Sequence, residues 1–257
     1  MVMEEKMEKI RIENLSVRYS DGNESLRNIN LSIKANEITV LFGPAGGGKS
    51  TLLRTMNRLN DLADVDKLDG AVYLNGENLL LDDINVTKLR RNVGMVFSRP
   101  VPLPLSIYDN VCYGLVSAGE KNRQVLDEAV EKALKQAYVW DEVYDRLQSP
   151  AHALSGGQQQ RVCLARVLAL EPEVILLDEP TSALDPVSTA KIEQTLQELK
   201  KEFTIILVPH NTQQAARVAD FAAFFLQGEL VEANTGEQLF SFPKDTRTEE
   251  YIEGRFG

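Results

Sequence analysis

Residues 38–50 read ITVLF-GPAGGGKS and decide the expected fold. Ile38–Phe42 is continuously apolar and carries β-branched residues, which is typical of a strand buried on both faces. Gly43–Ser50 then fits the pattern G-x-x-x-x-G-K-[ST], and a helix is expected from Lys49 to about Arg58. In a strand–loop–helix unit of this kind, backbone N–H groups and a helix N-terminus can surround a phosphate. The segment therefore predicts a phosphate-binding loop in an α/β fold.

The side chains of this loop are expected to contact a nucleoside triphosphate and its metal ion. Lys49 would neutralise β- and γ-phosphate oxygens, the Ser50 hydroxyl would hold Mg²⁺, and Thr51 would lie near the α-phosphate. ATP and Mg²⁺ are the expected cofactors. The expected nucleotide-binding residues here are Gly43, Pro44, Ala45, Gly46, Gly47, Gly48, Lys49, Ser50 and Thr51.

A second apolar strand, Val174–Leu177, is followed directly by Asp178 and Glu179. Asp178 is expected to stabilise the Mg²⁺ shell, through a water molecule, and Glu179 is placed where a carboxylate can polarise an attacking water. Acids are also common where a strand end meets solvent. The presence of the phosphate loop in the same chain favours the functional interpretation.

The segment Leu154–Gln158 reads LSGGQ and is the most specific of the motifs. Ser155 is suited to cap a helix, and Gly156 and Gly157 would let its N-terminus approach a ligand closely. An ordinary capped helix is the alternative. Because the chain already has one phosphate loop, this second helix terminus would serve a nucleotide held by another protomer.

The rest of the chain alternates between strands and helices, which predicts a mostly parallel, covered sheet. A helical segment from 106 to about 170 interrupts this pattern, and Ser106 with Asp109 resembles a capping box at its start. Hairpins are expected from 71–74 to 78–81, through Asn75-Gly76, and from 221–226 to 229–231. Further strands are expected at 14–19, 29–33, 93–97 and 204–208, and helices at 126–137, 186–201 and 212–218.

Composition excludes several classes of function. The net charge is −10 and the pI is near 4.9, which argues against nucleic acid as the main partner. Two cysteines, Cys112 and Cys163, form no disulfide framework, and the presence of only two histidines argues against a His-based metal site. No run approaches the ~20 apolar residues of a membrane span, and the charged opening MVMEEKMEK does not resemble a signal peptide. We expect a soluble protein of the reducing cytosol, and any role at a membrane would require a partner.

Together, the motifs resemble those of the ATP-binding-cassette (ABC) ATPases, over essentially the whole chain. Leu154–Gln158 matches the family's signature, about 110 residues after the phosphate loop. Ser182–Asp185 matches its D-loop. His210 follows a strand where the family has its switch histidine, and Tyr19 lies where an aromatic ring stacks on adenine. A core histidine and a packed strand tyrosine are the alternatives at these two positions.

The resemblance implies a P-loop NTPase (RecA-like) α/β core with a mostly parallel sheet, an N-terminal antiparallel β subdomain and an inserted α-helical lobe. The chain would be a single ABC ATPase domain over 1–257. Its ATP-binding core would span about 1–97 and 166–257, and the helical lobe with the signature about 98–165.

The resemblance also implies a head-to-tail nucleotide-sandwich dimer. Each ATP would lie between one chain's phosphate loop and the other chain's Ser155, Gly156, Gly157 and Gln158. Glu179 would activate water, His210 would contact the γ-phosphate and help to position Glu179, and Lys49 would stabilise developing charge. Arg161, next to the signature, is expected to hold local carboxylates or carbonyls and is given no catalytic role.

Several segments narrow the resemblance to the ATPases of bacterial phosphate importers, above all the C-terminal run 243–257. The implied partners are a second copy of the chain when ATP is bound, two integral membrane permease subunits near Pro100–Asn110, and indirectly a periplasmic or extracellular phosphate-binding protein. The implied location is the cytoplasmic face of a bacterial membrane. The alternatives are an importer of another cargo, such as molybdate, tungstate or an amino acid, and an ATP-dependent switch without transport.

One position departs from the family. The segment after Val93–Phe97 normally reads Phe-Gln-Arg/Lys-Pro, but this chain has Ser98 where the glutamine stands. In the family that glutamine reaches Mg²⁺ and the attacking water. The shorter Ser98 side chain is expected to reach the metal only through a water or after an inward loop shift, or else the change is neutral.

Overall fold

The structure is a computed structural model that describes residues 7–255, in two compact units. The first contains the chain up to Arg90 and from Lys200 onward, and the second contains Arg91–Leu199. Residues 1–6 of the charged opening, and Phe256 and Gly257 of the C-terminal run, lie outside the described residues. Among the residues that are described, no helix has both the length and the apolar character needed to cross a membrane.

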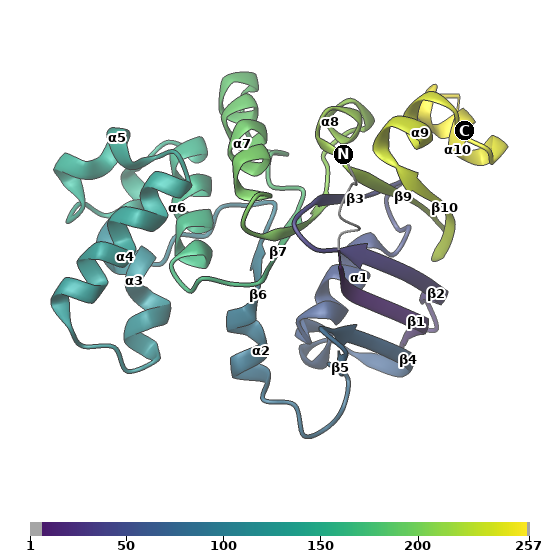
Figure 1. Cartoon of the computed structure of the whole chain (residues 1–257), viewed down its shortest axis with the longest axis horizontal. Helices are drawn as coiled ribbons and strands as arrows, with labels where there is room; N and C mark the ends of the chain where they lie inside the picture. The colour runs from purple at the N-terminus through teal and green to yellow at the C-terminus, as the bar shows by residue number, and fades with distance from the viewer. Residues whose placement is uncertain (1–6, 256–257) are drawn as a thin grey trace. The chain divides into compact units, whose positions relative to one another are not determined.

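An antiparallel sheet in the first unit has the strand order β2-β1-β4-β5 (Figure 1). Its strands are β1 (Glu8–Tyr19), β2 (Glu24–Lys34), β4 (Val65–Leu74) and β5 (Glu77–Asn78). The buried β1 side chains are Ile10, Ile12, Leu15 and Val17, so the predicted two-residue period holds on each side of an irregularity between Ile12 and Leu15. The antiparallel β subdomain is present as expected. The expected hairpin strand at 78–81 is wrong beyond Asn78, because the Asn78 Oδ1 accepts the Leu80 N–H at 3.1 Å and turns the chain.

The first unit also contains the strands that carry the phosphate loop. They are β3 (Ile38–Phe42), β8 (Thr204–Val208), β9 (Phe221–Leu226) and β10 (Glu229–Thr235), in the order β10-β9-β3-β8. β3 pairs in parallel with both β8 and β9, and β10 is antiparallel to β9. All five residues of β3 are buried, as its continuous apolar run predicts.

The helices of the first unit begin close to the expected positions. They are α1 (Lys49–Met56), the 3₁₀ turn η1 (Leu59–Leu62), α8 (Thr212–Val218), α9 (Gly236–Ser241) and α10 (Thr246–Ile252). No pattern in the sequence predicted α9 or α10. Each is only one to two turns long and starts at a polar N-cap, Thr235 or Asp245, whose side chain accepts a backbone N–H.

The second unit combines two parallel strands with a group of helices (Figure 1). β6 (Val93–Val96) pairs in parallel with β7 (Val174–Asp178) and follows α2 (Val86–Asn92). The helices are α3 (Ile107–Ser117), α4 (Arg123–Gln136), α5 (Trp140–Val143), α6 (Gly156–Leu168) and α7 (Pro186–Leu199), with 3₁₀ turns η2 (Tyr144–Arg146) and η3 (Ala151–Ala153). α6 packs on both α3 and α4, so the expected helical segment is confirmed.

The start of α3 differs in one detail from the expected capping box. Ser106 Oγ accepts the Asp109 N–H at 2.9 Å, but the Asp109 carboxylate accepts from the Ser106 hydroxyl at 2.6 Å rather than from its backbone N–H. The aspartate side chain is one methylene shorter than the glutamate of a complete capping box. This difference is consistent with a hydrogen bond to the Ser106 hydroxyl in place of the Ser106 backbone N–H.

Candidate active site

The phosphate loop is shaped by glycines that no other residue replaces without strain. Gly43, Gly46 and Gly48 have φ values of 137°, 76° and 93°. A Cβ atom added at Gly43 would lie 2.0 Å from the Phe225 carbonyl oxygen, and one at Gly48 would lie 2.2 Å from the Ser25 carbonyl oxygen. The backbones of β9 and β2 therefore hold the loop from two sides.

The N-terminus of α1 lies at the end of the phosphate loop. Its N-cap, Gly48, provides no side-chain hydrogen bond, so the first N–H groups of the helix have no cap from that residue. The Lys49 ammonium folds back over the loop and donates to the carbonyl oxygens of Gly43 at 2.8 Å and Pro44 at 2.7 Å. A cation at 9% exposure beside the N-terminus of a helix matches the needs of a phosphate group.

Thr51 connects the loop to two other strands of the first unit. Its hydroxyl lies 3.1 Å from the Tyr19 hydroxyl and 2.7 Å from the Ser25 hydroxyl. Tyr19 and Thr51, predicted separately from the sequence, thus lie together in the structure. No local sequence pattern predicts the Ser25 contact, because it depends on how β2 packs beside the loop.

His210 lies two residues after β8 and is exposed. Its backbone N–H donates to the Gln214 side chain at 3.0 Å, and Asn211 caps α8 by accepting the Gln214 N–H at 2.8 Å. The exposure excludes the alternative of a buried core histidine. The position is therefore fixed by capping of the helix that follows it.

The two acids of the second unit differ in environment. Asp178 ends β7 and is 9% exposed, whereas Glu179 is half-buried. Glu179 has φ 50°, in the left-handed region, which costs a non-glycine residue ~1–2 kcal/mol. Its carbonyl accepts the Ser182 N–H at 3.1 Å in the turn that follows. Such strain is often found at functional positions, and the sequence alone did not reveal it.

Ser98 lies near these acids by topology. Val96 of β6 pairs with Leu177 of β7, so Ser98, which follows β6, and Asp178, which ends β7, lie at the same edge of two neighbouring parallel strands. The preceding Phe97 carbonyl accepts from Gln160 Nε2 of α6 at 2.9 Å. Gln160, only 1% exposed, therefore links this segment to the signature helix. No pattern in the sequence predicted this link.

The signature segment starts α6 with a complete capping box. Ser155 Oγ accepts the Gln158 N–H at 3.4 Å, and the Gln158 Oε1 accepts the Ser155 N–H at 3.1 Å. Ser155 and Gly156 are exposed and Gly157 is buried. The predicted helix cap is confirmed, and its exposed start leaves room for a ligand.

The side chains predicted to hold Mg²⁺ carry hydroxyl and carboxylate oxygens, the type of ligand that this ion takes. The described residues contain no group of three or more His, Cys, Asp or Glu side chains able to hold a metal alone. The oxygen donors predicted for the ion, Ser50, Asp178 and Ser98, suit a hard cation that usually takes one or two carboxylates together with phosphate oxygens.

These features define the class of protein: a P-loop nucleotide-binding protein with an α/β core. The description "ABC transporter" fits residues 26–182, and the chain therefore belongs to the ABC transporter family. It is 52% identical, over 96% of its length and 92% of the relative's, to the phosphate import ATP-binding protein PstB of Mycoplasma capricolum subsp. capricolum. The expected family and fold class are confirmed.

Solved structures agree with this assignment. The cbiO1 protein from Clostridium perfringens, part of the ABC transporter complex cbiONQ, is 29% identical with a TM-score of 0.80, over 98% of this chain and 97% of that one. A dimeric structure of the ATP-binding cassette MJ0796 in a post-hydrolysis state, bound to ADP and Pi, is 32% identical with a TM-score of 0.75, over 88% of this chain and 98% of that one.

Proposed function

We propose that this chain is the ATP-hydrolysing subunit of an importer of inorganic phosphate. The observation that carries the proposal is 52% identity to a phosphate import ATP-binding protein over 96% of the chain. The net charge of −10 supports the expectation that nucleic acid is not a partner.

In the proposed cycle, two chains bind ATP and close head to tail as a nucleotide sandwich. Each nucleotide would lie between Gly43–Thr51 of one chain and Ser155–Gln158 of the other, with Tyr19 against the adenine. The position of the α1 start directly after the glycine loop, and the exposed start of α6, support two phosphate-binding termini of this kind. The dimeric structures solved for MJ0796 support the assembly.

Different residues of the chain have different roles in ATP hydrolysis. Glu179 orients and activates the attacking water, and His210 supports that geometry at the γ-phosphate. Lys49 leaves the Gly43 and Pro44 carbonyls to stabilise negative charge on the transferring phosphoryl group. Bound Mg²⁺, held by Ser50 and through water by Asp178, would supply further charge stabilisation on the phosphate oxygens.

The helical lobe, over about 98–165, is proposed to transmit closure to two membrane permease subunits at the cytoplasmic face. Its loop at Pro100–Leu105 is held firmly, because Asn110 accepts the Leu103 N–H at 2.7 Å and donates to carbonyls of the same loop. Arg166 of α6 donates to the Val101 carbonyl at 3.3 Å. A loop braced against the signature helix can pass motion between them.

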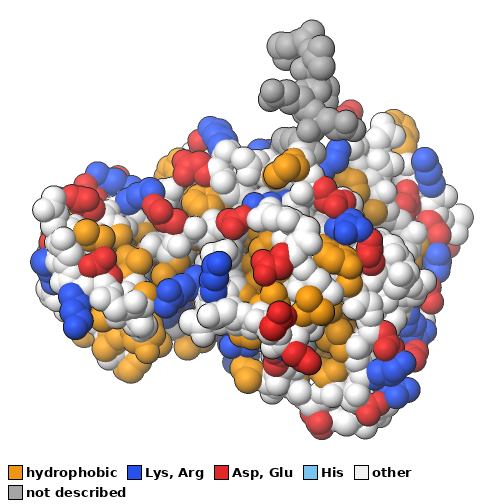
Figure 2. Space-filling view, turned by 60° about the horizontal axis from the view of Figure 1, so that its bottom comes forward, with side chains coloured by type: hydrophobic (Ala, Val, Ile, Leu, Met, Phe, Trp, Pro, Cys, Tyr) orange, Lys and Arg blue, Asp and Glu red, His pale blue; other side chains and the backbone are white. Residues whose placement is uncertain are grey.

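Exposed apolar side chains support a protein-binding surface there. The large apolar residues exposed between 97 and 116 are Phe97, Val101, Leu105, Tyr113 and Val116. Figure 2 shows exposed apolar side chains (orange) lying among charged ones on one face of the molecule. Several large apolar side chains exposed within one short segment favour a contact with a partner there.

The composite site is tested with Glu179→Gln. This variant should retain ATP binding, hydrolyse it severely slowly and accumulate an ATP-bound dimer in size-exclusion chromatography with Mg-free ATP. Lys49→Ala is the matched control and should lose nucleotide binding itself. Hydrolysis by Glu179→Gln at the wild-type rate would remove Glu179 from its role.

The cargo is tested in the complete importer. The chain is reconstituted with its two permease subunits in vesicles, and the ATPase rate is measured with phosphate and its binding protein. Phosphate should stimulate hydrolysis, whereas molybdate, tungstate and amino acids should not. Stimulation by one of these other solutes alone would reassign the cargo.

A further inference from the structure

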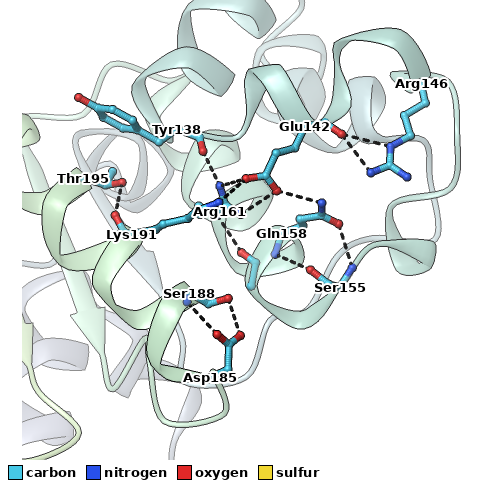
Figure 3. A network of polar contacts seen from close by, with 11 residues as sticks. Tyr138, Glu142, Arg146, Ser155, Gln158, Arg161, Asp185, Ser188, Lys191 and Thr195 are labelled. Atoms are coloured by element: carbon cyan, nitrogen blue, oxygen red, sulfur yellow. Dashed lines mark hydrogen bonds and ion pairs between the residues drawn. The ribbon is translucent and has the colours of Figure 1, made fainter.

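Glu142 of α5 is the centre of a polar network in the second unit (Figure 3). Its carboxylate accepts two hydrogen bonds from Arg161, at 2.9 Å to Oε1 and 3.0 Å to Oε2. The same carboxylate accepts from Gln158 Nε2 at 2.9 Å and from Lys191 Nζ at 2.8 Å. One side chain of α5 thus accepts from donors on two other helices, because Arg161 and Gln158 belong to α6 and Lys191 to α7.

The contacts of Glu142 extend directly into the signature segment. Gln158, which donates to Glu142, uses its other side-chain atom to accept the Ser155 N–H at 3.1 Å. Arg161, only 3% exposed, also donates to the Gly157 carbonyl at 3.3 Å and to the Tyr138 carbonyl. Because bonds to a charged group are short and directional, the carboxylate fixes the rotamers of both side chains.

The network also fixes α7 beside the signature. A Cβ atom added at Gly157 would lie 2.4 Å from the Ser188 Oγ, so the starts of α6 and α7 approach closely. Ser188 in turn donates to the Asp185 carboxylate at 2.6 Å, at the end of the D-loop segment. Lys191 lies on the same helix as Ser188 and reaches Glu142 from that side.

We propose that Glu142 is a positioning residue that holds the signature segment Ser155–Gln158 at a fixed geometry relative to the D-loop end of α7. The inference rests on the proposed function, since both segments would meet the nucleotide of the second protomer only after closure. Hydrogen bonds to the Arg161 guanidinium lower the pKa of Glu142 to about 2, so the carboxylate stays charged at any working pH. No motif in the sequence singled out this residue.

The experiment uses the Glu179→Gln chain as background and adds Glu142→Gln or Glu142→Asp. The amide keeps the size of the side chain but cannot act as an anion toward Arg161 and Lys191. Glu131→Gln is the matched control, because Glu131 forms an exposed ion pair with Lys135 within α4. Two constants are measured by ultracentrifugation and nucleotide titration: dimer dissociation with ATP, and ATP binding to the single chain.

We expect Glu142→Gln to weaken the ATP-bound dimer by about tenfold or more, in line with the loss of bonds to a charged group. ATP affinity of the single chain should change less than about twofold, because the phosphate loop lies in the other unit. Glu142→Asp should restore part of the dimer affinity, and Glu131→Gln should change neither constant. A purely structural role would lower the melting temperature without separating the two constants.

Two results would overturn the inference alone: a dimer as tight in Glu142→Gln as in the background, or equal weakening by Gln and Asp. Absence of an ATP-dependent dimer in the background chain would instead overturn the proposed function, and the inference with it. If circular dichroism shows that Glu142→Gln does not fold, Lys191→Met carries the test, since this half-exposed lysine can be replaced at little cost to folding. A dimer weakened about twofold or more supports the role, and an unchanged dimer contradicts it.

Discussion

Replacement of Gly48 by alanine should separate steric exclusion from backbone strain in the phosphate loop. Gly48 and Gly46 both have positive φ, 93° and 76°, so alanine is strained at either position. They differ in their surroundings: a Cβ at Gly48 would lie 2.2 Å from the Ser25 carbonyl oxygen, whereas nothing lies within 4 Å of one at Gly46. Gly46→Ala is therefore a matched control that carries the strain without the clash.

The magnitudes follow from these two differences. A left-handed alanine costs ~1–2 kcal/mol, offset by ~0.4–1 kcal/mol from the lower entropy of the unfolded chain, so Gly46→Ala should destabilise by about 1 kcal/mol. Gly48→Ala adds an overpacking cost of ~1–3 kcal/mol, and the obstructing atom is backbone and cannot move by a rotamer change. The total expected for Gly48→Ala is about 2–4 kcal/mol.

Urea unfolding without nucleotide, followed by circular dichroism, measures both variants against the parent chain. ATP titration of the folded variants should also show weaker binding for Gly48→Ala than for Gly46→Ala. The clash of the new Cβ atom with the β2 backbone can be relieved only by displacing the phosphate loop. Equal destabilisation by the two substitutions would refute the reasoning, since strain alone would then account for both.

Three further predictions concern the second unit. Ser98→Gln should raise the ATPase rate and lower the Mg²⁺ concentration needed for half-maximal activity, with little change in ATP affinity. The reason is that a well-placed polar group at a reacting centre contributes ~10²-fold in rate. Equal rates and equal Mg²⁺ midpoints across a titration would show that Ser98 already performs the role of the family's glutamine. The pKa of Glu142, about 2 against an ordinary value of 4.5, means that its ionised form stabilises the fold above about pH 4.5 and that this contribution is lost as pH falls toward 2. The stability difference between wild type and Glu142→Gln in urea unfolding should therefore shrink over that range, and a constant difference would contradict the ionic role. Asn110→Ala should destabilise the fold by ~1–3 kcal/mol, because it leaves backbone groups of Leu103–Ser106 unpaired. In the reconstituted importer it should reduce the phosphate-stimulated ATPase rate more than the basal rate. A parallel fall of both rates would argue against a coupling role.

Local patterns were enough to predict the elements of the chain that carry its chemistry. Ile38–Phe42, the glycine loop and the start of α1 were predictable because a buried parallel strand and an N–H-rich loop each require residues within one short segment. The capping box at Ser155 was likewise predictable, because its two hydrogen bonds join residues three apart. The family followed from the spacing of these motifs.

Contacts between residues distant in sequence were decided only by the tertiary structure. Ser25 and Phe225 press on the phosphate loop from β2 and β9, and neither position has a local signature. Glu142 was missed for the same reason: in sequence it is one acid among several, and it becomes the hub of the signature segment only when α5, α6 and α7 pack together. The period and spacing of residues determine which side chains a helix or strand presents on each face. Packing between segments far apart in sequence determines which of those side chains come into contact. No local pattern in a single sequence specifies these long-range contacts.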